Sequence, residues 1–342
     1  MGLRNAIALP SSRPWAALGL GALGALGAVW LDGGWSWPGG QASTGQASHG
    51  GAPALWLCDR GAKRVVALDR QGFVVDEVRA PLALEVAAGA EGGLWILQAT
   101  ARGPRAPRRL TLFPAERGAG PTLELARAWG LEAAGSGVRL LAGVAGEEVL
   151  LELSPEGSQR EIASLPGASR WCSSPAGSLV VLGEGRRLEL LRPASGAPVA
   201  EPRQLEGACL ALAPAPEGWY ILEQLAERRR LSRLGAELER VWSRHELWKG
   251  GGGLQGDFLL PSLEGGVWVL GRRGELARFD GRGELRAGGR SLQGPVLGGC
   301  PDPAGGCWLF TPGGCLAIDV DARPRPGQGG FVELVDACAV PR

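Results

Sequence analysis

Histidine and asparagine, which are frequent in catalytic and metal-binding sites, are scarce in this sequence. The chain has two histidines, and His245 is the only one beyond the Gly-rich stretch that contains His49. Its single asparagine is Asn5. Zinc sites and His-based acid–base pairs need several such groups close together. We therefore predict no catalytic residue, no metal ligand and no bound cofactor in the main part of the chain.

One segment combines aromatic and basic side chains in a way typical of binding surfaces. It is Glu239–Gly253, which contains Trp242, His245, Trp248 and Lys249 and ends in a run of glycines. Tryptophan and arginine are enriched in interaction hot spots, and long connections in compact domains are often functional. We predict a binding site here. The alternative is an outer strand whose tryptophan packs on its neighbour.

A second candidate binding segment is rich in arginine. It is Ala99–Arg109, with Arg102, Arg105, Arg108 and Arg109. Such a cluster is suited to an anionic partner or to lipid headgroups. The alternative is a solvated loop in a chain that uses arginine in place of lysine almost everywhere.

The seven cysteines have no CxxC spacing, which argues against zinc binding and thioredoxin-type redox chemistry. Two pairs are disulfide candidates if the domain is exported. Cys300 and Cys307 flank one predicted hairpin, and Cys58 and Cys338 fall on strands that we expect to be adjacent. The alternative is that the cysteines are small buried hydrophobic residues.

A repeat from Ala54 onward predicts the elements that would position these residues. Each unit has an apolar strand, a Gly-containing turn and a strand with an aromatic or apolar residue at one fixed position. The aligned positions are Trp56, Trp95, Arg139, Val180, Tyr220, Trp268 and Trp308. Their mean spacing of about 42 residues is typical of four-stranded β-propeller blades. We expect Trp56, Trp95, Trp268 and Trp308 to lie in the core between blades.

The first unit lacks its innermost strand, and the chain ends with an apolar strand, Val335–Val340. We predict that this strand completes the first blade and removes the open edges. The sequence therefore indicates an all-β fold, a propeller of about seven four-stranded blades closed by a C-terminal strand.

Three carboxylates fall near predicted innermost strands or their turns: Glu85, Asp257 and Asp302. Calcium prefers several oxygen ligands, so a calcium-stabilised channel is an alternative to the absence of a cofactor. The same carboxylates are the basis of a second functional hypothesis, an exported lyase or hydrolase with its acidic residues at the central channel.

The segment Cys58–Gly72 (CDRGAKRVVALDRQG) resembles an NHL repeat, and Glu275–Gly283 repeats its second half. TolB-like and YVTN-like bacterial propellers share these motifs. The resemblance implies a propeller and a protein- or ligand-binding role, and it implies no particular reaction.

The N-terminal region differs from the repeat. Residues 1–31 contain arginines followed by the uncharged run Pro14–Leu31, which predicts a hydrophobic helix that is a cleaved signal peptide or a membrane anchor. Residues 32–53 are rich in Gly, Ser and Gln and predict a flexible linker to the propeller at 54–342. The positive-inside rule places the propeller outside the cytoplasm.

Net charge is +1, so no overall field favours nucleic acid. We therefore expect a secreted or membrane-anchored propeller that acts as a binding or scaffold module. Its expected partners are the membrane, through the N-terminal segment, and an unidentified protein or other macromolecule. We expect a binding role rather than an enzymatic one.

Overall fold

The structure is a computed structural model, and it describes residues 52–339 apart from short gaps. The gaps are residues 90–91, 104, 115–119, 145–146, 175–176, 227, 246–255, 263, 292–294, 303–304, 313 and 330–333. The predicted hydrophobic helix at 1–31 and nearly all of the linker lie outside the described residues. Within them the chain forms 28 strands and one short 3-10 helix, Glu184–Arg186.

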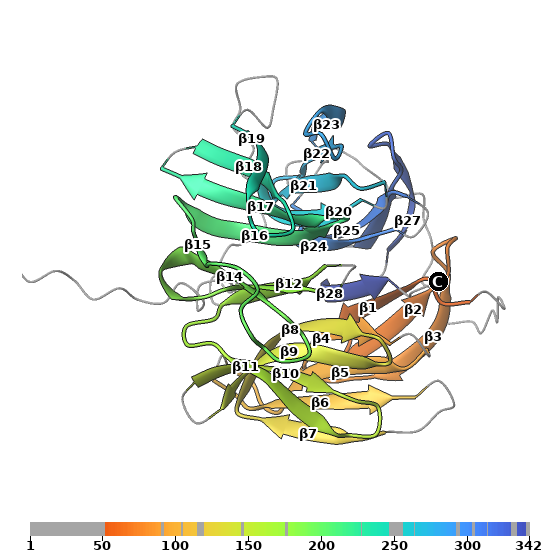
Figure 1. Ribbon diagram of the computed structural model, residues 1–342. Coiled ribbons are helices and arrows are strands. Elements are labelled where there is room, and N and C mark those ends of the chain that lie inside the picture. Colours follow the sequence, from red (N-terminus) through yellow and green to blue (C-terminus); the bar gives the residue numbers. More distant parts are fainter. Residues whose placement is uncertain are drawn as a thin grey trace, which may run out of the picture.

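The strands form seven four-stranded antiparallel sheets, which confirms the predicted propeller (Figure 1). Blade 1 contains β28 (Leu334–Ala339), β1 (Leu55–Asp59), β2 (Arg64–Leu68) and β3 (Val74–Arg79). Blade 2 contains β4 (Ala83–Ala88), β5 (Leu94–Ala99), β6 (Arg108–Phe113) and β7 (Thr122–Leu125). Blade 3 contains β8 (Arg127–Ala134), β9 (Gly137–Val144), β10 (Glu147–Leu153) and β11 (Gln159–Ser164).

The remaining blades continue the same order around the ring. Blade 4 contains β12 (Arg170–Ser173), β13 (Leu179–Leu182), β14 (Arg187–Leu191) and β15 (Arg203–Gln204). Blade 5 contains β16 (Ala208–Ala215), β17 (Gly218–Leu225), β18 (Arg228–Leu234) and β19 (Arg240–Arg244). Blade 6 contains β20 (Gly256–Pro261), β21 (Val267–Gly271), β22 (Glu275–Phe279) and β23 (Leu285–Ser291). Blade 7 contains β24 (Gly298–Pro301), β25 (Cys307–Thr311), β26 (Gly314–Ile318) and β27 (Pro324–Gly329).

The C-terminal strand closes the ring, as the sequence predicted. β28 pairs with β1, with Ala339 opposite Leu55 and Ala337 opposite Leu57. It also packs against β4 of blade 2 and β24 of blade 7. Figure 1 shows this strand, in dark blue, beside the orange strands of blade 1. The two ends of the repeat are thus held in one sheet.

The hydrophobic core is divided among the seven seams between consecutive blades. Each seam holds one cluster of buried side chains, including a cluster between blades 7 and 1 that contains Leu57 and Trp308. The predicted core tryptophans Trp56, Trp95, Trp268 and Trp308 are all buried and each faces the following blade. Because a blade is covered on both sides, both faces of its second strand are apolar.

The repeated Asp-x-x-Gly motif has a local structural role at the turns between third and fourth strands. Asp69 Oδ1 accepts hydrogen bonds from the backbone N–H groups of Gln71 and Phe73, at 2.9 Å each. Asp280 makes the same pair of contacts with Arg282 and Glu284. A turn held by its own aspartate satisfies backbone donors and sets the hairpin register. The motif is therefore a structural feature of the blade turns, and it is no evidence for a binding site.

Candidate functional site

The connections of the propeller lie on two faces, because neighbouring strands within each blade are antiparallel. The hairpin face, as we call it, carries the turns between first and second strands and between third and fourth strands. The crossover face carries the connections between second and third strands and the links from one blade to the next. Since Leu55 lies opposite Ala339, β1 begins and β28 ends on the hairpin face.

A repeated backbone hydrogen bond builds the crossover face. In blades 1, 4 and 6, an N–H of the link to the next blade donates to a carbonyl of the connection between second and third strands. The pairs are Ala80 to Lys63, Leu205 to Arg186 and Val296 to Arg272, at 2.9 to 3.0 Å. In blade 3, Leu165 donates instead to the carbonyl of Glu148, near the start of β10, at 2.8 Å. These bonds hold each link beside the connection, or the strand start, that precedes it on this face.

Charge is segregated between the two faces. Within the described connections of the crossover face, basic residues predominate: Arg60, Lys63, Arg102, Arg105, Arg186, Arg272 and Arg273, against Glu184 and Glu206. In those of the hairpin face, acidic residues predominate: Asp69, Glu156, Glu201, Glu217, Glu237, Glu239, Glu264, Asp280, Glu284, Asp302, Asp319 and Asp321, against Arg70, Arg192, Arg282 and Arg323. The small net charge of the chain conceals this arrangement.

Exposed cations gather where blades 1 and 2 meet on the crossover face. We call the group Lys63, Arg79, Arg102 and Arg105 the basic corner, and all four side chains are exposed. Other arginines nearby already have carboxylate partners. Arg64 pairs with Glu77 at 3.0 Å, and Arg109 pairs with Glu124 at 2.6 Å.

The structure therefore divides the arginine-rich segment predicted from the sequence. Arg102 and Arg105 lie exposed in the connection between β5 and β6, as a binding role requires. Arg109 is tied to Glu124 across the β6–β7 pair, and the charge of Arg108 interacts with Glu85. The sequence reasoning missed Lys63 and Arg79, which come from blade 1 and reach this region only through the fold.

Two carboxylates on innermost strands, Glu85 and Glu132, are bonded to the following blade. Glu85 Oε2 in β4 accepts the backbone N–H of Leu131 in β8 at 2.6 Å. Glu132 in β8 accepts the N–H and the hydroxyl of Ser173 in β12. Burial raises the pKa of both carboxyl groups, against hydrogen bonds that lower it. Glu132 is a residue that the sequence reasoning did not select.

Glu132 begins a line of alternating charges across blade 3. Arg139 lies directly opposite Glu132, Glu152 lies opposite Arg139, and Arg160 lies opposite Glu152. Arg139 Nε donates to Glu152 at 2.7 Å, and Arg160 Nη2 donates to it at 2.8 Å. Burial raises the pKa of Glu152, but the two guanidinium groups outweigh it and hold that pKa below its ordinary value. Arg139 occupies the position that tryptophan holds in four other blades, so the seam between blades 3 and 4 is partly polar.

Asp302, another of the predicted acidic residues, does not join Glu85. Asp302 lies in the β24–β25 turn on the hairpin face and pairs with Arg325 at 2.6 Å. The side chain of Asp257 lies outside the described residues. Among the side chains that the structure describes, no three His, Cys, Asp or Glu come together as metal ligands.

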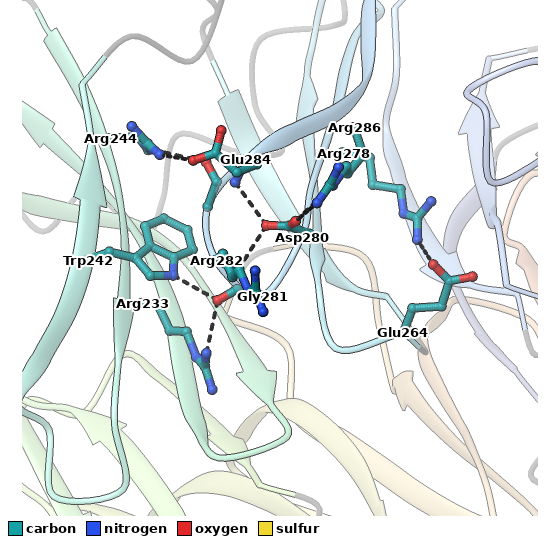
Figure 2. Close-up of polar contacts among 11 residues, drawn as sticks. Arg233, Trp242, Arg244, Glu264, Arg278, Asp280, Gly281, Arg282, Glu284 and Arg286 are labelled. Carbon is teal, nitrogen blue, oxygen red and sulfur yellow. Dashed lines mark hydrogen bonds and ion pairs between the residues drawn. The ribbon is translucent and has the colours of Figure 1, made fainter.

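The predicted Trp242 segment is divided between an outer strand and residues that the structure does not describe. Trp242 lies in β19, is half-buried and packs against the seam between blades 5 and 6. Its Nε1 donates to the Gly281 carbonyl at 2.9 Å, and Arg233 Nη1 donates to the same oxygen at 2.9 Å. Figure 2 shows both side chains directed at this carbonyl. For Trp242 the structure thus matches the alternative given above, an outer strand whose tryptophan packs on the next blade.

His245 is exposed just after β19. Trp248 and Lys249 lie outside the described residues. A binding role for these three residues stays a prediction.

The strand register also bears on the predicted disulfides. Cys300 lies opposite Trp308 and Cys307 lies opposite Pro301, so the two cysteines are on opposite faces of the hairpin and in different core clusters. Cys307 is a free thiol, and the predicted Cys300–Cys307 disulfide is therefore wrong. Cys338 lies opposite Trp56, diagonal to Cys58. The side chain of Cys338 is outside the described residues, so the second pairing stays a prediction.

No described helix is long and apolar enough to cross a membrane, and the hydrophobic segment at the N-terminus lies outside that part of the chain.

Comparison with known proteins identifies the fold and no family. No protein-family model matches the sequence, and no curated protein matches it. Solved structures match over most of the chain. A protein from Lactobacillus plantarum matches with a TM-score of 0.62 at 10% identity, covering 84% of this chain and 99% of its own.

Two other matches have descriptive names. Sqt1 from Saccharomyces cerevisiae has a TM-score of 0.58 at 10% identity, covering 81% of this chain and 83% of its own. A catalytically inactive virginiamycin B lyase from Staphylococcus aureus, determined with quinupristin, has a TM-score of 0.55 at 11% identity, covering 75% and 87%. Identities this low show the shared propeller fold alone. The resemblance to TolB-like and YVTN-like propellers is confirmed at that level, and the NHL assignment stays a prediction.

Proposed function

We propose that this protein is a binding propeller, secreted or held at the outer side of a membrane, that recognises a partner protein through its crossover face. The observation that carries this proposal is the placement of the exposed cations. Lys63, Arg79, Arg102 and Arg105 collect on that face, while the acidic turns lie on the opposite one. Complementary charge on two partners accelerates encounter and excludes wrong partners.

The use of the buried carboxylates supports a binding role over catalysis. Glu85 and Glu132 each accept backbone N–H groups from the next blade, which is a structural task. A general acid or base instead needs an oxygen atom within hydrogen-bond reach of the substrate proton that it transfers.

A second candidate function is an exported lyase or hydrolase that uses these carboxylates. The observation in its favour is the raised pKa of Glu85 and Glu132, because such shifts are common at active sites. Native mass spectrometry tests this candidate. A small molecule that copurifies with the full-length chain and is lost in the Glu85→Gln, Glu132→Gln double variant would favour the enzyme.

The location outside the cytoplasm rests on the sequence of residues 1–31, with Arg4 and Arg13 before an uncharged run. Both ends of the ring lie on the hairpin face. A linker that enters there leaves the crossover face directed away from the attachment point.

The test is cross-linking in the native host, followed by immunoprecipitation of the full-length chain from separated membrane, exported and cytoplasmic fractions. We expect the chain in the membrane or exported fraction, with one stoichiometric protein partner. N-terminal sequencing then distinguishes an anchor from a cleaved signal. Recovery from the cytoplasm, or without a partner, would contradict the proposal.

A further inference from the structure

We propose that the basic corner docks an acidic segment of the partner protein. This inference rests on the proposed binding function and names the chemistry of the partner and the part of the crossover face that it contacts. The corner consists of Lys63, Arg79, Arg102 and Arg105, as defined above.

Backbone hydrogen bonds make the corner one continuous surface. Ala80, the neighbour of Arg79, donates its N–H to the Lys63 carbonyl at 2.9 Å. In the same link, the Leu82 carbonyl accepts the N–H of Ala99 at 3.0 Å, and the Pro81 carbonyl accepts a hydrogen bond from Gln98 Nε2 at 3.0 Å. The connections that carry the four cations are therefore held side by side across the boundary between blades 1 and 2.

Three carboxylates on strands of blades 1 and 2 already pair with other arginines. Asp59 is fully buried and faces Arg64, and Glu77 pairs with the same arginine. Glu124 is taken by Arg109. The corner is thus a local excess of exposed positive charge that the fold itself does not neutralise. Guanidinium groups bind carboxylates in a bidentate geometry, so three arginines and a lysine suit a run of Asp or Glu side chains.

Other occupants fit the structure less well. The N-terminal residues 1–53 contain a single carboxylate, Asp32, so this chain's own linker cannot supply an acidic run. A second copy would have to bring its acidic hairpin face to the corner, and such a head-to-tail contact leaves an open stack. An attachment on the hairpin face turns the corner away from the membrane that holds the protein.

The test uses the full-length protein in detergent and labelled poly-L-glutamate as the probe, with binding followed by fluorescence anisotropy. The corner variant carries Lys63→Glu, Arg79→Glu, Arg102→Glu and Arg105→Glu. The matched control carries Arg70→Glu, Arg192→Glu, Arg282→Glu and Arg323→Glu. These four control arginines are also exposed, but they lie on the hairpin face, and both variants change the net charge equally.

We expect the corner variant to bind poly-L-glutamate at least about tenfold more weakly than the wild type, with the control close to wild type. We also expect the wild-type affinity to fall as salt is added. Equal losses in both variants would mean that only net charge matters, and would overturn the inference. So would tighter binding of phosphatidylglycerol vesicles or duplex DNA than of poly-L-glutamate at the same corner.

Sedimentation velocity tests the remaining occupant, a second copy of this chain. Concentration-dependent self-association that is lost in the corner variant would identify that second copy as the occupant. Recovery of the partner from the host distinguishes the proposed binding function from the proposed acidic docking surface. If the corner variant still retains that partner in full, the binding function stands and the acidic docking surface is wrong. If the wild type has no partner, the binding function itself fails.

Discussion

Arg230 donates two hydrogen bonds to Glu223 Oε2 on the adjacent strand, from Nε at 3.0 Å and from Nη2 at 2.8 Å. The two residues lie directly opposite each other in β18 and β17, and both are almost completely buried. Arg230 also donates to Glu206, which Arg240 contacts as well. These two guanidinium groups lower the pKa of Glu206 to about 2.

Replacing Arg230 with methionine should be strongly destabilising, because it leaves Glu223 buried without its cation. We expect a loss of about 3–5 kcal/mol in the free energy of unfolding, measured by urea denaturation. The control is Arg109→Met, which breaks the exposed pair with Glu124, also a directly opposed cross-strand pair. It should cost about 1 kcal/mol or less. Equal effects of the two substitutions would show that burial of the pair is unimportant.

Deletion of residues 334–342 should destabilise the whole ring. It removes β28, which pairs with β1 and packs on the blades at either side, and it leaves an open sheet edge. We expect a large drop in melting temperature and exposed apolar surface that binds a hydrophobic dye. Deletion of residues 340–342 alone, which leaves β28 whole, is the control. A melting temperature unchanged by the longer deletion would refute closure by this strand.

The pH dependence of stability should report the buried carboxyl group of Glu85. Burial raises its pKa above 4.5, so the folded protein holds the proton more tightly than the unfolded chain. This contribution to stability is complete below pH 4.5 and is lost as the pH rises through the raised value. The stability of wild type relative to Glu85→Gln should therefore fall from acidic to neutral pH.

Glutamine suits this comparison because its carbonyl oxygen can still accept the N–H of Leu131 and it does not titrate. The same exchange at exposed Glu217 is the control, and the measurement is urea denaturation at a series of pH values. A relative stability that instead rises with pH would mean that the hydrogen bonds to Glu85 outweigh its burial.

Gly130 should tolerate alanine less well than Gly177 does. Both have positive φ, +69° and +87°, so alanine brings backbone strain of about 1 kcal/mol at each. A Cβ at Gly130 would lie 2.9 Å from Trp171 Nε1, whereas a Cβ at Gly177 meets nothing within 4 Å. The clash also disturbs the 2.8 Å hydrogen bond from Trp171 to the Gly130 carbonyl.

We expect Gly130→Ala to lower the free energy of unfolding by about 2–3 kcal/mol and Gly177→Ala by about 1 kcal/mol. Urea denaturation measures both variants. A similar loss in each would show that the Trp171 contact contributes little beyond the shared backbone strain.

Local patterns along the chain were sufficient to predict the architecture. The spacing of Trp56, Trp95, Trp268 and Trp308 was enough to predict four-stranded blades and buried seams, because strand pairing and turn chemistry are local properties that recur with the repeat. The missing first strand and the apolar C-terminal strand were enough to predict closure. The sequence alignment of the repeats also showed that Arg139 replaces the tryptophan of other blades. It did not show that Glu132 and Glu152 lie opposite Arg139.

The composition of the surface and the pairing of charges depend on how the blades pack in three dimensions. Lys63 and Arg105 belong to different blades and share a surface only once the ring has formed. The sequence left two interpretations of Trp242 open, and the choice follows from the hydrogen bond of its indole to the Gly281 carbonyl of the next blade. Net charge and composition are sums over the chain, whereas segregation of charge between two faces depends on where each connection lies. Contacts between residues distant in sequence exist only after the blades have packed, so a repeat pattern read along one chain cannot specify them.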